Sequence, residues 1–219
     1  MAKIDSMDQF GGDVAEARFA DMFDRYRQHL GWIGVAIIVA GVGAWFYLRS
    51  ESIKSERADA AYEAALQSVS SGNIPLAQSD LSKAATRYAG TNGGSEAAMA
   101  LAKLDFQQSK YQDGISALRG PASNGGDLQF EARMLMGSGY EGMTQWAQAA
   151  KTYEDAASIA RFDGDKASAR AMAARALQAG GEKAGAIKIW NDLINNPHGS
   201  FATEAEIRLG ELQGAPVKS

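Results

Sequence analysis

The sequence predicts an all-α protein: a single N-terminal transmembrane helix, then an α-solenoid of about four helix pairs, then a C-terminal capping helix. The first supporting observation is an uncharged apolar run over residues 30–48, followed by a polar, alanine-rich chain. The second is a pattern of small and large residues that recurs four times along that polar chain. Repeats of this kind bury a continuous core by stacking each unit on its neighbours.

The apolar run reads LGWIGVAIIVAGVGAWFYL. At ~1.5 Å per residue it spans roughly 28 Å as a helix, close to the ~30 Å hydrocarbon core of a bilayer. Aromatic residues near its two ends match the expected headgroup levels: Trp32, Trp45, Phe46 and Tyr47. We therefore predict a membrane helix in contact with lipid. The alternatives are a buried core helix, which is usually amphipathic or shorter, and a cleaved signal peptide, which starts with a short basic segment.

The charges beside the run leave its orientation open. Three Lys or Arg residues lie near each end: Arg18, Arg25 and Arg27 before it, and Arg49, Lys54 and Arg57 after it. The positive-inside rule therefore gives a tie. Before the run, apolar residues from Val14 to Leu30 recur at spacings of three to five. This spacing predicts either a helix lying in the membrane interface or a solvated helical extension of the span.

Composition excludes several classes of function. The chain has a net charge of −4 and no cysteine, so disulfides, zinc–thiolate sites and thiol nucleophiles are excluded. No cluster of five or more Lys and Arg residues is present, which argues against nucleic acid as a partner. About 170 residues follow the span, enough for one domain with its own core.

The clearest repeat unit lies within residues 130–156. A large and a small residue are followed by an aromatic residue, and a second segment then places alanines around another aromatic residue. This order is similar to the tetratricopeptide repeat (TPR), in which two antiparallel helices approach closely through small residues. The packing residues of this unit are Met136, Gly137, Tyr140, Ala149, Tyr153 and Ala156.

The second-helix part of the pattern recurs in three other units. Their packing residues are Ala77, Leu81 and Ala84, then Gly114 and Leu118, and finally Ala186, Trp190 and Leu193. The first residues of the four units are 37, 35 and 37 residues apart. A turn precedes each unit: Gly72-Asn73, Ser109-Lys110, Met143-Thr144 and Gly180-Gly181. Four units in phase favour a TPR-like solenoid over a generic helical bundle.

These patterns predict five segments along the chain. They are an N-terminal extension (1–29), a transmembrane helix (30–48), a juxtamembrane connector (49–57), a TPR-like domain (58–213) and a flexible tail (214–219). The last helix of the domain is expected from Ser200, as its N-cap, to Leu212. We expect it to cover the open end of the solenoid, because terminal repeats need a polar outer surface.

No set of residues in the sequence suggests catalysis. The two histidines, His29 and His198, have no partner at a meaningful spacing, and phosphate-binding, metal-binding and nucleophile motifs are missing. The sequence therefore predicts a non-enzyme without catalytic, cofactor or metal sites. The remaining candidate is a partner-binding groove lined by first helices, with Met99, Lys103, Gln107, Arg133, Arg170 and Arg175. Its arginines suit a carboxylate ligand, although ordinary solvated helix charges explain them too.

The layout of the chain resembles a known family. A short acidic start precedes a span that ends in Ala44-Trp45-Phe46-Tyr47, the next helix carries Ala60-Ala61-Tyr62-x2-Ala65, and TPR-like pairs run to the C-terminus. This resembles the YfgM-like family of membrane-anchored TPR proteins, ancillary subunits of the SecYEG translocon. The resemblance implies a single-pass protein of the bacterial inner membrane with a cytoplasmic start and a periplasmic TPR domain. It implies translocon subunits and a periplasmic foldase or chaperone as partners, and no catalytic residues.

Two hypotheses for function follow. The first is a membrane-tethered TPR scaffold that mediates protein–protein interactions, as an ancillary or chaperone-docking factor at the secretion translocon. The second is a structural accessory subunit, whose membrane helix and TPR domain brace a larger membrane complex. Small residues on the span, such as Gly34 and Gly41, would suit helix contacts in that case.

Overall fold

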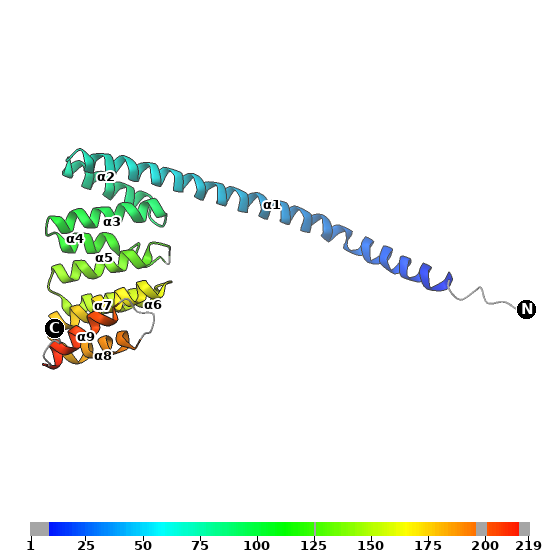
Figure 1. The fold of residues 1–219 in the computed structure, drawn as a ribbon. Coiled ribbons are helices and arrows are strands. Elements are labelled where there is room, and N and C mark those ends of the chain that lie inside the picture. Colours follow the sequence, from blue (N-terminus) through cyan, green and yellow to red (C-terminus); the bar gives the residue numbers. More distant parts are fainter. Residues whose placement is uncertain (1–8, 125, 196–200, 215–219) are drawn as a thin grey trace, which may run out of the picture. The chain divides into compact units, whose positions relative to one another are not determined.

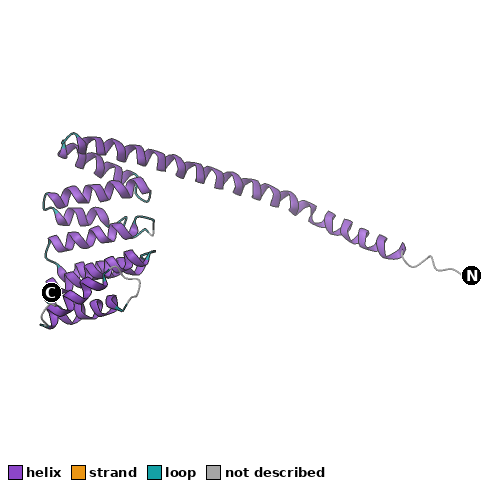
Figure 2. Cartoon of the chain, viewed as in Figure 1, coloured by secondary structure: helices purple, strands orange, loops and turns teal. Residues whose placement is uncertain are grey.

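A computed structural model describes the backbone of residues 9–124, 126–195 and 201–214, and within these ranges the side chains from Trp32 onward. The described residues form helices and turns, without a strand (Figure 2). The helices are α1 (Gln9–Ser70), α2 (Ile74–Arg87), α3 (Asn92–Gln107), α4 (Tyr111–Leu118), α5 (Gln129–Gly142), α6 (Trp146–Ile159), α7 (Asp163–Ala179), α8 (Lys183–Ile194) and α9 (Ala202–Gln213). The predicted all-α class is confirmed.

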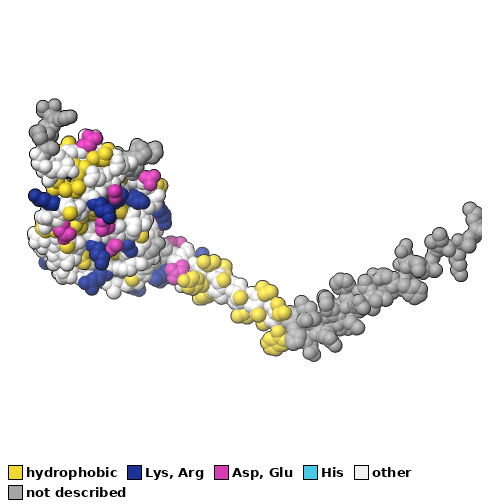
Figure 3. Space-filling view, turned by 90° about the horizontal axis from the view of Figure 1, so that it is seen from below, with side chains coloured by type: hydrophobic (Ala, Val, Ile, Leu, Met, Phe, Trp, Pro, Cys, Tyr) yellow, Lys and Arg dark blue, Asp and Glu magenta, His cyan; other side chains and the backbone are white. Residues whose placement is uncertain are grey.

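Helix α1 contains the predicted span and runs on, through residues 49–57, into the repeat domain. The chain divides into two units between Ile53 and Lys54, and each is described by itself. In the first unit, large apolar side chains from Trp32 to Leu48 are exposed, and they form the yellow surface along α1 in Figure 3. By length and composition, the described part of this helix is suited to cross a membrane.

Some sequence predictions concern positions whose placement is not described. The predicted amphipathic stripe and His29 depend on the side chains of residues 9–31, which the structure does not describe. His198, the predicted N-cap Ser200 and residues 215–219 also lie outside the described residues.

The second unit is a stack of helix pairs (Figure 1). The C-terminal part of α1 packs against α2 through the cluster that contains Ala65, Ala77 and Leu81. Helix α3 pairs with α4, α5 with α6, and α7 with α8, and α9 follows the last pair. Three residues connect the two helices of every pair. A connection this short makes the two helices antiparallel neighbours, as expected for TPR-like units.

The same backbone turn closes all four pairs. Its central residue adopts the left-handed conformation, with φ of 75° at Gly72, 61° at Ser109, 57° at Thr144 and 82° at Gly181. At the first turn, the Gly72 N–H donates to the Val69 carbonyl (3.0 Å) and the Asn73 N–H donates to the Ser68 carbonyl (3.1 Å). The other three turns repeat both bonds. This is the Schellman motif, which satisfies the last carbonyls of the first helix and ends it.

The packing of each pair is in register with its turn. Five residues after the left-handed residue comes a buried small residue: Ala77, Gly114, Ala149 and Ala186. Twelve residues before each of these is another buried small residue: Ala65, Ala102, Gly137 and Ala174. Four residues after each residue of the first set comes a large side chain that is fully buried: Leu81, Leu118, Tyr153 and Trp190. The small residues let the two helices approach, and the large side chains then fill the core.

The remaining predicted packing residues are also placed in the core or at its edge. Ala84, Ala156 and Leu193 are buried, whereas Met136 and Tyr140 are half-buried. The second pair lacks the corresponding third apolar residue, since Pro121 occupies that position. Its helix α4 ends at Leu118, before Gly120 and Pro121, because proline has no N–H to continue the helical hydrogen bonds.

Helix α9 covers the last pair. Its buried Ala205 and Leu209 belong to the same apolar cluster as Trp190 and Leu193 of α8. The helix ends at Gln213, before Gly214, which has a φ of 71°. The TPR-like solenoid with a C-terminal capping helix is therefore confirmed.

Candidate protein-interaction face

The solvent-facing side of the first helices is the candidate interaction face. Tyr62, Met99 and Met134 occupy equivalent positions in the first three pairs, and all three are half-buried. On α3, Met99, Lys103 and Gln107 are four residues apart and therefore share one side of the helix. Lys103 and Gln107 are exposed, while Met99 packs against the cluster that contains Ala102 and Leu118. We call this side the first-helix face, with Tyr62, Met99, Lys103, Met134, Glu141 and Arg175 as its residues.

Arg133, predicted to line the groove, connects neighbouring segments of the chain. Its Nε donates to the Ala122 carbonyl and its Nη1 to the Asp155 carbonyl, each at 3.0 Å. Ala122 follows α4 and Asp155 lies on α6, so this side chain joins the second pair to the third. Guanidinium groups suit this role because they present several donors in a fixed plane.

Arg170 and Arg175 also have acceptors within the chain. Arg170 pairs with Asp192 of α8. Arg175 makes a two-bond contact with the carboxylate of Glu204 on α9, including Nε to Oε1 at 2.8 Å. The hydrogen bonds from Arg175 lower the pKa of Glu204, and Glu204 raises the pKa of Arg175. A carboxylate ligand at either arginine would have to displace a partner that is already bound.

Glu141, near the end of α5, introduces a carboxylate beside this pair. Burial raises its pKa, and the charge of Arg175 opposes that shift. The hydroxyl of Tyr153 is buried and lies near the Glu141 carboxylate. Burial, followed by the Glu141 charge, raises the pKa of Tyr153. Tyr153 is fully buried and packs in the core against Gly137.

The opposite end of the first-helix face is also acidic. Burial raises the pKa of Tyr62, and the charges of Glu96 and Glu63 add to the effect. Below this face, buried Asp105 accepts a hydrogen bond from the Gln78 amide at 2.8 Å. Burial raises the pKa of Asp105, which is the largest effect on it. Lys103 is thus an exposed cation on a face whose other charged groups are mainly carboxylates or paired arginines.

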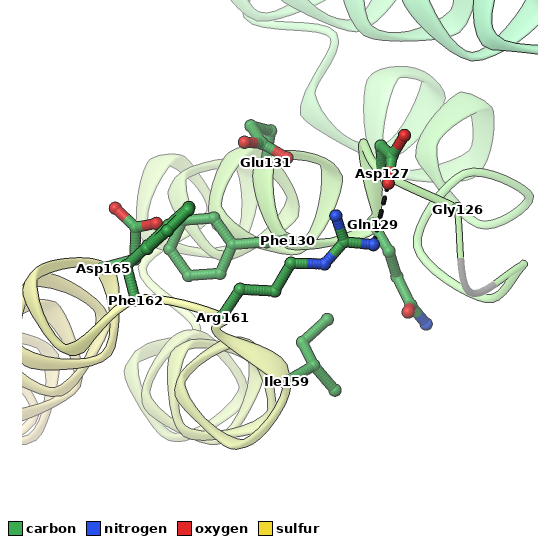
Figure 4. Close-up of a pocket in the computed structure, with 9 residues that line it drawn as sticks. All are labelled: Gly126, Asp127, Gln129, Phe130, Glu131, Ile159, Arg161, Phe162 and Asp165. Atoms are coloured by element: carbon green, nitrogen blue, oxygen red, sulfur yellow. Dashed lines mark ion pairs between the residues drawn. The ribbon is translucent and has the colours of Figure 1, made fainter.

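A separate pocket of about 230 Å³ opens where α5 and α7 begin. Figure 4 shows Phe130 and Glu131 entering it from α5, Asp165 from α7, and Arg161 and Phe162 from the turn between α6 and α7. Arg161 reaches across to Asp127, with a nitrogen–oxygen distance of 2.7 Å. The pocket therefore combines aromatic side chains with several carboxylates.

A second pocket, of about 260 Å³, lies over α3 between α2 and α4. Small residues line most of it, including Ala85, Ala98 and Ala117. It also reaches Gly120 and Pro121, where the short α4 has ended. Among the described residues, no group of three or more His, Asp or Glu side chains is placed to hold a metal ion.

A model of the tetratricopeptide repeat-like domain family matches residues 21–136, more than half of the chain. The chain belongs to this family. The match covers the predicted span and the pairs up to the middle of α5. TPR domains generally bind other proteins and typically act as non-catalytic scaffolds, which agrees with a face of exposed side chains on a rigid helical stack.

Two solved structures share this TPR fold. One is a crystal structure of nearly identical TPR-like repeats from Podospora anserina, described as those of a candidate kinesin light chain. It is 15% identical, has a TM-score of 0.54, and the match covers 73% of this chain and 87% of that chain. A substituted form of the same repeats is 14% identical with the same TM-score, covering 73% and 86%. Similarity at this level shows the fold alone, and no curated protein matches the chain.

The packing residues predicted from the sequence are buried or half-buried, and the pattern did not name the residues around them. Glu204 and Asp192 carried no repeat signal, because their arginine partners are 29 and 22 residues away, and Phe162 carried none because it lies in a turn. One feature of the sequence could have indicated the pocket: Phe162 is a large apolar residue between Arg161 and Asp163, in a turn. An aromatic side chain in so polar a turn is a candidate contact residue.

Proposed function

We propose that this protein is a membrane-tethered TPR scaffold that binds protein partners beside the bilayer, as an ancillary or chaperone-docking factor at the secretion translocon. The observation that carries the proposal is the apolar helix from Trp32 to Leu48, with Ile37, Ile38 and Val39 each about two-thirds exposed. A surface this apolar needs lipid or protein to cover it. The TPR domain begins on the same helix, so the span would hold the domain close to other membrane proteins.

The resemblance to YfgM-like proteins supports the finer part of this proposal. It suggests the bacterial inner membrane, a periplasmic TPR domain, and translocon subunits or a periplasmic foldase as partners. The TPR domain would offer its first-helix face, where Lys103 is exposed and engages no intrachain acceptor among the described residues.

Topology is the first test. Protease added to spheroplasts should digest the TPR domain, while inverted vesicles should protect it. The opposite pattern would place the domain in the cytoplasm and remove every periplasmic partner. Carbonate extraction of the full chain, compared with a variant that lacks residues 30–48, checks the anchor itself: the full chain should stay in the membrane pellet and the variant should not.

Site-specific photocrosslinking tests the partner. A photoreactive residue replaces Lys103 on α3 or, as the matched control, Lys83 on α2, whose side chain is 72% exposed. We expect adducts with translocon subunits or a periplasmic foldase at position 103 and few at position 83. Equal adducts at both positions, or none with these proteins, would refute the proposal.

The second candidate function is a structural subunit of a larger membrane complex. It is favoured by Gly34, Gly41 and Gly43, because the space where a Cβ would stand is open at all three. Such positions let another helix approach closely. Replacing Gly34 and Gly41 by Leu should abolish the complex while the TPR domain stays folded. An intact complex would leave the scaffold function as the better account.

A further inference from the structure

The pocket at the start of α5 and α7 has the size of a binding site for one side chain. At about 230 Å³ it is smaller than the ~300–1,000 Å³ clefts that take whole small molecules. Its floor is apolar, with Phe130 and Ile159, and its rim is charged. Phe130 is half-buried against Ala156, Ala157 and Ala169, so the floor is fixed by the core of the third and fourth pairs.

The rim carries more negative than positive charge. Three carboxylates line it, from Asp127, Glu131 and Asp165, against one guanidinium, from Arg161. Asp127 is paired with Arg161, whereas Glu131 and Asp165 make no ion pair or hydrogen bond among the described residues. The N-termini of α5 and α7 each add roughly half a positive charge. The sum remains about one negative charge, so the pocket favours a cation.

Phe162 gives the pocket an aromatic wall. Its side chain is 70% exposed, more than any other large apolar residue described in the repeat domain. Phe130 and Asp165 line the same pocket, and Figure 4 shows the three side chains. A planar cation stacks on such a ring while its charge meets a carboxylate, and this combination suits arginine better than lysine.

We propose that this pocket receives an arginine side chain of a protein partner, stacked against Phe162 and paired with Glu131 and Asp165. This inference rests on the proposed function, because it assigns the scaffold an anchor point for a basic segment of its partner. The anchor lies at the turns between helices and is separate from the first-helix face. A partner that binds both the pocket and the first-helix face would contact the third repeat at two sites.

The test is a titration of the full chain in detergent with a seven-residue peptide that carries one central arginine. The readout is the ¹³C-methyl signal of Ile159, which lines the pocket, with buried Ile115 and Ile189 as internal references. We expect a saturable shift of Ile159 alone. The same peptide with citrulline, which keeps the shape and lacks the charge, should bind at least tenfold more weakly. Equal binding of the two peptides would overturn the proposal.

Charge variants of the pocket should change the affinity for the arginine peptide in opposite directions. A unit charge about 4 Å away at an exposed site changes cation binding about fivefold. The double variant Glu131→Gln and Asp165→Asn should therefore weaken arginine binding at least tenfold. Arg161→Gln should strengthen it severalfold, because it removes a cation and frees Asp127. Glu154→Gln, on an exposed part of α6 outside the pocket, should change nothing.

Phe162→Leu tests the stacking contact separately. It keeps an apolar wall but removes the aromatic face, so the preference for the arginine peptide over a lysine peptide should disappear. A preference that survives in this variant, or unchanged binding in the double variant, would refute the assigned contacts. Circular dichroism of each variant verifies that the helices remain intact.

The outcome is independent of the cellular experiments. The titration uses defined peptides, so its failure leaves any crosslinks from position 103 standing. If the titration succeeds and the crosslinks are absent, the pocket chemistry holds and the translocon role fails.

Discussion

The contact between Gly137 and Tyr153 predicts that Gly137→Ala destabilises the natural chain but stabilises a chain that carries Tyr153→Leu. A Cβ at Gly137 would lie 2.5 Å from Cε1 of Tyr153 and 2.7 Å from two other ring atoms. Ordinary contacts of this kind are about 3.5–4.0 Å. The ring is fully buried. The first two repeats instead combine an alanine with a leucine: Ala65 with Leu81, and Ala102 with Leu118.

The magnitude follows from two opposing effects. Overpacking at a rigid core position costs typically ~1–3 kcal/mol, and replacing glycine by alanine inside a helix gains about 1 kcal/mol. Gly137→Ala should therefore lower the free energy of unfolding by about 1 kcal/mol in the natural chain. In the Tyr153→Leu background the clash is gone and only the helix gain remains. The same change should then raise the free energy of unfolding by about 1 kcal/mol, a coupling of about 2 kcal/mol.

The assay is guanidinium unfolding of the full chain in detergent, followed by far-ultraviolet circular dichroism for all four members of the cycle. Gly164→Ala on α7 is the control, because the space around Gly164 is open and the change reports helix propensity alone. If Gly137→Ala destabilises both backgrounds equally, the ring contact does not explain this glycine. A gain in the natural background would refute the reasoning as well.

Two further predictions concern the turns and the charged pair. Thr144→Gly should stabilise the chain by about 0.5–1 kcal/mol, because a β-branched residue holds a φ of 57° there. Gly181→Ala, at a φ of 82°, should destabilise the chain by about 1 kcal/mol. Thermal scans in which Thr144→Gly lowers the melting temperature and Gly181→Ala raises it would contradict the turn geometry. Glu204→Gln should cost about 1 kcal/mol at pH 7, since both partners of the ion pair are partly exposed. The pKa of Glu204 is lowered by Arg175, so this stabilisation is complete above its unfolded pKa of 4.5 and is lost as pH falls through the lower folded value. The deficit of the variant should therefore shrink as the pH falls below 4.5, and a deficit that stays constant with pH would contradict the role of this pair.

Repetition explains how much of this fold could be predicted from the sequence. Each TPR unit needs small residues at fixed distances from its turn, so Ala77, Gly114, Ala149 and Ala186 were visible as one spacing. The turns were equally visible at Gly72 and Gly181, where glycine suits a positive φ, and less so at Ser109 and Thr144. The length of α4 was harder to predict, because Gly120 and Pro121 interrupt a unit whose first half fits the pattern.

The side-chain partners on the surface obeyed no such spacing. Arg133, Arg170 and Arg175 have the composition of a carboxylate-binding groove, yet in the structure their donors meet Ala122, Asp155, Asp192 and Glu204. Those acceptors come from the loop after α4 and from neighbouring helices, and their distance along the chain varies from 11 to 29 residues. Only the packing of one pair on the next determines which of these groups come within hydrogen-bond distance.

The sequence by itself therefore determined the helical class, the apolar run over residues 30–48 and the period of the TPR stack, because each depends on local composition or on a repeated interval. Tertiary structure decided which charges are neutralised and which remain available. It placed Glu204 against Arg175, leaving that guanidinium occupied, and it brought Glu131 of α5, Phe162 and Asp165 of α7 into the lining of one pocket. Electrostatic contacts of this kind depend on distances of a few ångströms between separate helices, and a linear pattern contains no such distances.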